Sequence, residues 1–146
     1  MRADIDPVLD GLIRTLPRIY RDKDFEITRH GPTGLRFRGH PRDLEDMIGN
    51  LLDNAVKWTK DQVMVTLAEV DGNMSLTIED NGPGLAPEQF AEAVKRGARL
   101  DEATPGTGFG LSIVNDLAEA YKGRFTLDRA AIGGLKAVLH LPVAKD

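Results

Sequence analysis

Two alternating runs of apolar and polar residues, joined by a short turn, most constrain the fold of this chain. Residues 63–70 (VMVTLAEV) and 74–80 (MSLTIED) carry apolar side chains at every second position, which is the period of a half-buried β-strand. Asp71-Gly72-Asn73 lies between them and is typical of a hairpin turn. With 146 residues, 41% of them hydrophobic, the chain is long enough for one core and short for two. We therefore expect a single domain, 1–146, built on a sheet with antiparallel strands.

Other segments show the period of an α-helix, with apolar residues three and four positions apart. Pro41 is expected in the first turn of its helix, and Gly123 at the end of the last helix. Pro17 predicts a bent or broken final turn in the first helix. The expected helices are 5–20, 41–59, 87–96 and 110–122.

The remaining strand signals form two pairs. Residues 25–30 and 35–39 are expected to form a hairpin through the loop Gly-Pro-Thr-Gly, and residues 124–129 and 135–142 a second hairpin. Residues 97–108 are expected to be a long irregular loop. The whole pattern predicts an α+β fold of two layers, in which a mixed, mostly antiparallel sheet packs against about three helices.

Composition excludes several classes of function. The formal net charge of -4 argues against a general nucleic-acid binder, and the absence of cysteine excludes disulfides, thiolate metal sites and cysteine nucleophiles. Lack of cysteine also suits a reducing, cytoplasmic location. No run of about 18 apolar residues and no signal segment is present, so we expect no membrane contact by this domain, although a parent protein could be anchored elsewhere.

One face of the 41–59 helix carries a polar stripe beside its apolar residues. Asn50, Asn54 and Lys57 fall at helical spacings of four and three. A solvated helix edge is one interpretation. The other is an oxygen ligand for Mg²⁺ with a positive charge for phosphate, because Mg²⁺ usually takes one or two protein oxygens beside phosphate oxygens and water.

The sequence Asp80-Asn81-Gly82-Pro83-Gly84 ends the second strand of the hairpin. Asn-Gly and Gly-Pro are common in turns, so a plain strand-ending turn is one interpretation. In the other, a buried Asp80 accepts a hydrogen bond from an exocyclic amine, while Gly82 and Gly84 let a planar ring approach the backbone.

A third motif, PGTGFGLSIV, places Gly106, Gly108 and Gly110 directly before a helix. Backbone N–H groups at such a helix start can bind phosphate, and a flexible linker is the alternative. The motif lacks the Lys-Ser/Thr of a P-loop and does not follow a strand as a dinucleotide fingerprint does. Positive charge lies just upstream, at Lys95, Arg96 and Arg99.

Taken together, and in this order, the motifs resemble the ATP-binding catalytic domain of sensor histidine kinases, within the superfamily of DNA gyrase, Hsp90 and MutL. NLLDNAVKW resembles the asparagine box of that family, DNGPGL its first glycine box and GTGFGLSIV its second, and RGARLD is most similar to PhoQ-type kinases. The resemblance implies a Bergerat-type ATP-binding fold with a mobile lid over ATP. Gln89-Phe90 occupies the region of the phenylalanine box, with a poor local match.

The resemblance also implies roles for individual residues. Asn54 and Asn50 would hold Mg²⁺, with Asn50 at the reacting phosphate, and Lys57 would contact phosphate. Asp80 would accept from the adenine amino group, and Trp58 stands where the family has tyrosine against the ring, a position equally compatible with core packing. Arg96 and Arg99 would face the γ-phosphate. The hinge of the lid and its phosphate-binding side would be formed by Gly106, Thr107, Gly108, Gly110 and Leu111.

The expected reaction is transfer of the γ-phosphoryl group rather than hydrolysis. Hydrolytic members of the superfamily carry glutamate where Asn50 stands, and a neutral amide cannot act as a general base toward water. Phosphoryl transfer would go to a histidine on a separate dimerisation domain and then to a response regulator. His30, His40 and His140 lack the helical setting of such an acceptor, so we expect ordinary surface or edge histidines. A nucleotide-gated interaction module or degenerate kinase is the alternative function.

Overall fold

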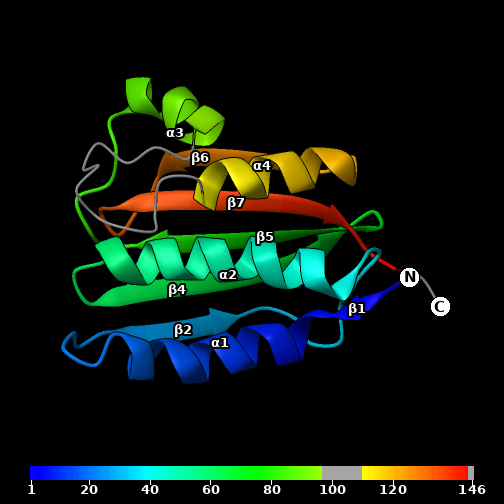
Figure 1. Ribbon diagram of the computed structural model, residues 1–146, viewed down its shortest axis with the longest axis horizontal. Helices are drawn as coiled ribbons and strands as arrows, with labels where there is room; N and C mark the ends of the chain where they lie inside the picture. The colour runs from blue at the N-terminus through cyan, green and yellow to red at the C-terminus, as the bar shows by residue number, and fades with distance from the viewer. Residues whose placement is uncertain (97–109, 145–146) are drawn as a thin grey trace.

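A five-stranded sheet forms one layer of the molecule (Figure 1). The computed structural model describes residues 1–96 and 110–144. In spatial order the strands are β2 (Glu26–His30), β4 (Gln62–Val70), β5 (Asn73–Asp80), β7 (Leu135–Pro142) and β6 (Arg124–Arg129). Only the β2–β4 pair is parallel among these, so the expected mixed and mostly antiparallel sheet is confirmed.

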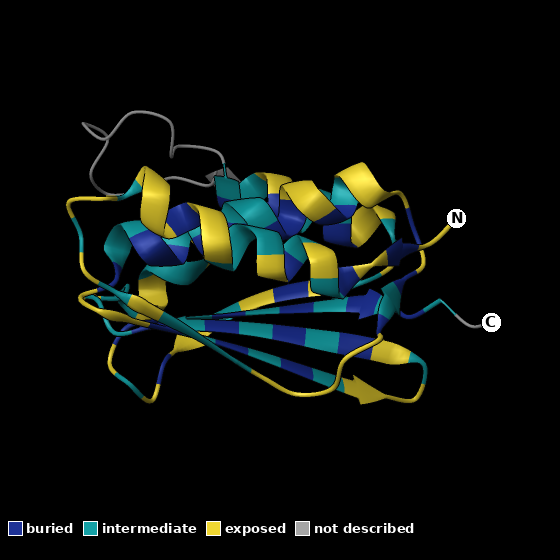
Figure 2. Ribbon diagram, turned by 90° about the horizontal axis from the view of Figure 1, so that it is seen from below, coloured by how far each residue is buried: buried dark blue, intermediate teal, exposed yellow. Residues whose placement is uncertain are grey.

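Helices form the second layer, on one face of the sheet (Figure 2). They are α1 (Ile5–Ile19), α2 (Pro41–Trp58), α3 (Phe90–Arg96), which follows a 3₁₀ turn at Pro87–Gln89, and α4 (Gly110–Ala120). Each of the central strands β4, β5 and β7 alternates between buried residues, which face the helices, and more exposed residues. The buried side chains of both layers form one hydrophobic cluster, as the two-layer α+β prediction requires.

The predicted central hairpin is confirmed, although its turn is two residues long because Asn73 already belongs to β5. Val70 pairs with Asn73, and Asp71 and Gly72 between them have positive φ angles of 52° and 81°. Two left-handed residues match the right-handed twist of a hairpin, which explains the choice of Asp-Gly here. Because the register is fixed in this way, Asp80 ends β5 at the edge of the core.

The first predicted hairpin is wrong. β2 pairs in parallel with β4, whereas β3 (Arg36–Phe37) pairs with the unpredicted strand β1 (Ala3–Asp4) in a separate two-stranded sheet. Gly31 sits so close to the β4 backbone that a Cβ atom there would lie 2.1 Å from Leu67 O. The glycine-rich loop therefore crosses beside β4 and leads the chain away from β2.

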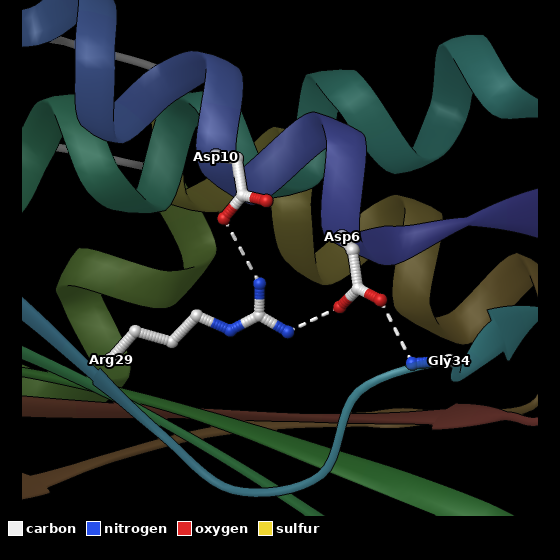
Figure 3. A network of polar contacts seen from close by, with 4 residues as sticks. All are labelled: Asp6, Asp10, Arg29 and Gly34. Atoms are coloured by element: carbon white, nitrogen blue, oxygen red, sulfur yellow. Dashed lines mark hydrogen bonds and ion pairs between the residues drawn. The ribbon is translucent and has the colours of Figure 1, made fainter.

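A polar network ties α1 to β2 (Figure 3). The guanidinium of Arg29 donates to Asp6 and, over 3.1 Å, to Asp10, while Asp6 also accepts from the backbone N–H of Gly34 at 2.8 Å. Arg29 is only 17% exposed, so these carboxylates compensate a charge that is largely removed from water. The network fixes both the direction of β2 and the loop that follows it.

The predicted helix bounds are close to the observed ones, with differences at the ends. α1 continues through Pro17 to Ile19, so its last turn is not broken. α4 ends at Ala120, two residues earlier than expected, because Lys122 takes the left-handed conformation and the Gly123 N–H donates to Ala118 O. Within the described residues, no helix is long and apolar enough to cross a membrane.

Candidate functional site

Asp80 is a buried carboxylate at the end of a central strand. It is 3% exposed, and its Oδ1 accepts a hydrogen bond from the Gly82 N–H at 2.9 Å. The backbone N–H of Leu135, at the start of β7, lies 3.5 Å from the same oxygen. A charged group is retained in such a place only where hydrogen bonds compensate the loss of water. Asp80 is therefore a fixed acceptor at the margin of the core, and its role in binding adenine stays a prediction.

Three glycines pack closely around this carboxylate. A Cβ atom on Gly82 would lie 2.0 Å from Trp58 O, and one on Gly134 would lie 2.1 Å from Asp80 Oδ1. Gly84 has a positive φ of 69° and lies against Gly134. Glycine is therefore required at position 82 by the close approach of the Trp58 backbone, and it is favoured at position 84 by the left-handed conformation.

The polar stripe of the asparagine-rich helix lies on α2 as predicted. Asn50, Asn54 and Lys57 are all partly exposed, while the neighbouring apolar face is buried. The Asn50 Nδ2 donates to Asp46 O at 2.7 Å. This bond engages the amide nitrogen within its own helix, so the carbonyl oxygen is the amide atom on the side of α4.

That oxygen faces the start of α4. A Cβ atom on Gly110 would lie 3.3 Å from Asn50 Oδ1, so the first residue of α4 passes directly beside it. Leu111 follows and is buried in the core, which fixes the helix start against α2. The first N–H groups of a helix can bind anions, and this junction places an amide oxygen beside such a helix start.

Trp58 is the last residue of α2, and it is partly buried. Its carbonyl oxygen lies against Gly82, so the helix end and the Asp80–Gly82 turn are in direct contact. Within residues 1–96 and 110–144, no cluster of three or more Asp, Glu or His side chains is arranged to hold a metal ion.

Two residues near the site were not predicted from the sequence. Asn81 accepts at its Oδ1 from the Thr59 hydroxyl and from three successive backbone N–H groups, those of Lys60, Asp61 and Gln62, at 2.8–3.1 Å. Asn81 therefore holds the α2–β4 turn against the end of β5. Gly134 is the second residue that was not predicted. The pair Gly133-Gly134 before β7 indicated a hairpin turn, and nothing in the sequence indicated its contact with Asp80.

Several predicted residues lie beyond what the structure describes. Arg96 is the last residue of α3. Arg99, Gly106, Thr107 and Gly108 lie in 97–109, outside the described residues, as does the predicted loop 97–108.

None of the three histidines has a helical setting, as expected. His30 is exposed at the end of β2, and His140 is a partly buried residue of β7. His40 precedes α2 and caps it, with its Nδ1 accepting from the Arg42 N–H at 3.0 Å.

The site lies at one end of the molecule. The C-terminal ends of α1 and α2, the end of β5 and the start of β7 gather at the left of Figure 1, and both chain termini lie at the right. Asp80, the last residue of β5, therefore lies at the same end of the sandwich as the C-terminal end of α2.

Similar proteins of known sequence are sensor kinases. The chain is 41% identical over 138 residues to the sensor protein kinase CarS of Pseudomonas aeruginosa, and the aligned region covers 94% of this chain and 31% of that protein. It is 34% identical over 133 residues to the two-component sensor PhoQ of Pseudomonas aeruginosa, covering 91% of this chain and 30% of that protein. The chain thus spans about a third of the length of these relatives.

Similar solved structures are histidine kinase domains. The mycobacterial sensor histidine kinase MprB matches with a TM-score of 0.83 and 29% identity, over 100% of this chain and 99% of that one. The ATP-binding domain of PrrB from Mycobacterium tuberculosis matches with a TM-score of 0.78 and 25% identity, over 99% and 98%. The family model described as histidine kinase-, DNA gyrase B-, and HSP90-like ATPase matches residues 39–145. The chain therefore belongs to the histidine kinase-, DNA gyrase B- and HSP90-like ATPase family, and its relatives within that family are sensor histidine kinases.

Proposed function

We propose that residues 1–146 are the catalytic, ATP-binding unit of a sensor histidine kinase. The observation that carries this proposal is the buried Asp80 carboxylate, which is fixed by the Gly82 N–H at the same end of the molecule as the C-terminal end of α2. Membership of an ATPase family and similarity to sensor kinases support it.

Asp80 recognises adenine in this proposal. An ionised carboxylate only accepts hydrogen bonds, so it matches the exocyclic amine of adenine and opposes a carbonyl in the same place. Gly82 and Gly84 shape this part of the pocket, because they let the turn that carries Asp80 pack closely on Trp58 O and on Gly134. Trp58 contributes apolar surface beside the ring.

The phosphates and Mg²⁺ are assigned to the junction of α2 and α4. Asn50 Oδ1 faces this junction because its amide nitrogen is bonded to Asp46 O. Asn54 and Asn50 would hold Mg²⁺ through their amide oxygens, and Lys57 and the start of α4 at Gly110 would bind phosphate. Bound Mg²⁺ supplies charge neutralisation of the phosphate oxygens. Arg96, Arg99, Gly106, Thr107 and Gly108 are assigned to the γ-phosphate and the lid on the resemblance alone.

The acceptor of the phosphoryl group is a histidine on a separate dimerisation domain, which then passes it to an aspartate of a response regulator. Asn50 supports transfer over hydrolysis, because an amide cannot remove a proton from water. Catalysis would come mainly from positioning and charge neutralisation. The unit would act in the cytoplasm, including where the parent kinase is anchored in a membrane.

The proposal is tested by mixing this chain and Mg²⁺-ATP labelled at the γ-phosphate with a separately produced dimerisation domain from the parent kinase. We expect label on the acceptor histidine, little release of free phosphate, and loss of labelling in Asp80→Asn. Nucleotide binding without labelling would favour the alternative, a nucleotide-gated interaction module. Rapid phosphate release by the isolated chain, abolished in Asp80→Asn, would contradict the assigned role of Asn50.

A further inference from the structure

Lys23 joins the candidate site from a loop that none of the quoted motifs contains. Its Nζ donates to the carbonyl oxygen of Lys57 at 2.9 Å, across 34 positions of sequence. Lys57 is the penultimate residue of α2, and the last carbonyl groups of a helix carry partial negative charge. The ammonium group therefore caps α2 at the end that contacts the Asp80–Gly82 turn.

The same ammonium group acts on Asp80. Burial lowers the pKa of Lys23, and the negative charge of Asp80 opposes that shift, so the two charges are close enough to interact. Asp80 Oδ1 is held by the Gly82 N–H at 2.9 Å, and Gly82 is held against Trp58 O, one residue after the carbonyl that Lys23 caps. Lys23 thus binds the end of α2 and places a positive charge within electrostatic reach of the carboxylate.

A buried carboxylate stays charged only when nearby donors and positive charges compensate its loss of water. The charge matters for recognition. The ionised form accepts hydrogen bonds only, whereas a protonated carboxyl can also donate one to a carbonyl oxygen. A protonated Asp80 would therefore distinguish less well between a purine with an amine at position 6 and a purine with a carbonyl there.

We propose that Lys23 is a positioning residue for adenine selectivity, because its ammonium group fixes the C-terminal end of α2 and keeps Asp80 a pure acceptor. This inference rests on the proposed function, since it concerns the base bound at Asp80. Lys23 does not touch the reacting phosphate in this account. Its effect is on which nucleotide binds.

The test compares the binding of Mg²⁺-ATP and of Mg²⁺-ITP by calorimetry, because inosine carries a carbonyl in place of the amine at position 6. Lys23→Gln removes the charge and retains an N–H donor for Lys57 O, and Lys23→Arg retains the charge. Lys60→Gln is the matched control, since Lys60 is an exposed lysine just beyond the same helix end. Thermal unfolding of each variant separates changes of fold from changes of selectivity.

In Lys23→Gln we expect the ratio of ATP to ITP affinity to fall by about fivefold or more, which is the difference between hydrogen bonds to charged and neutral acceptors. Lys23→Arg and Lys60→Gln should keep the wild-type ratio. An equal loss of both affinities in Lys23→Gln, or no change in the ratio, would overturn the inference while leaving the proposed function in place. A wild-type chain that binds neither nucleotide would contradict the proposed function as well.

Discussion

At position 134 the chain has no room for any side chain. A Cβ atom there would lie 2.1 Å from Asp80 Oδ1, 2.4 Å from Asp80 O and 2.8 Å from the Gly82 nitrogen. All three atoms belong to the turn that presents the carboxylate. Gly134 therefore shapes the candidate base site from a strand start 54 positions away in the sequence.

Gly134→Ala should displace Asp80 and weaken ATP binding by about tenfold or more, the loss expected when a charged hydrogen bond is misplaced. Overpacking should also lower the free energy of unfolding by about 1–3 kcal/mol. Calorimetric titration with Mg²⁺-ATP and urea unfolding measure the two effects.

Gly49→Ala is the control, because a Cβ atom at this α2 position meets nothing within 4 Å. It should raise the free energy of unfolding by about 0.5–1 kcal/mol and leave ATP binding unchanged. Wild-type affinity in Gly134→Ala would show that Asp80 is not held by this contact.

Single residues were predictable where their signal is local. Asp80 follows an alternating strand and precedes Gly82 and Gly84, so its position at a strand end could be read directly. Asn81 and Gly134 act through contacts with segments far away in the sequence, and nothing in their own neighbourhood reports those contacts.

At the scale of elements, α1 and β2 are joined by charge rather than by a turn. Arg29 bonds to Asp6 and Asp10 of α1, and the guanidinium is largely buried. Burial raises the pKa of Asp6, but the hydrogen bonds from Arg29 and from the Gly34 N–H outweigh it, so the pKa lies below its ordinary value of 3.8. The ionised form of Asp6 thus holds the first helix to the sheet.

A carboxyl group whose pKa is lower in the folded protein than in the unfolded chain stabilises the fold above the unfolded value, and the effect is lost as the pH falls through the folded value. The free energy of unfolding should therefore fall as the pH decreases below the ordinary pKa of 3.8, and less steeply in Asp6→Asn than in wild type. Asp6→Asn should also be less stable at pH 7.

Asp22→Asn removes an exposed carboxylate beyond the end of α1 and serves as the control. Its acid dependence should equal that of wild type in urea unfolding across this range. Identical slopes for Asp6→Asn and wild type would contradict the role of Asp6.

Elements were predicted well where periodicity and turn chemistry agree, as in α2 and the β4–β5 hairpin. The predicted hairpin of β2 and β3 was wrong, because a glycine-rich loop between two strand-like runs can either form a hairpin or lead the chain to another strand. The Arg29 network and the approach of Gly31 to Leu67 decide between these, and both are tertiary contacts.

At the scale of the whole molecule, the sandwich brings separate motifs to one end (Figure 1). Asp80 meets the C-terminal end of α2 there through the contact of Gly82 with Trp58 O, and the Lys23 loop lies beside them. Farther back along α2, Asn50 faces the start of α4. The family resemblance predicted that these motifs form one site, whereas helix and strand periodicity alone would not have placed Asp80 beside the end of α2.

The central claim is that Asp80 recognises the adenine of ATP, and calorimetric titration of wild type and Asp80→Asn with Mg²⁺-ATP tests it most directly. We predict saturable binding of one nucleotide by wild type, and an affinity at least about tenfold lower in Asp80→Asn, with both proteins folded by circular dichroism. Equal affinities in the two proteins, or no binding by wild type, would contradict the account.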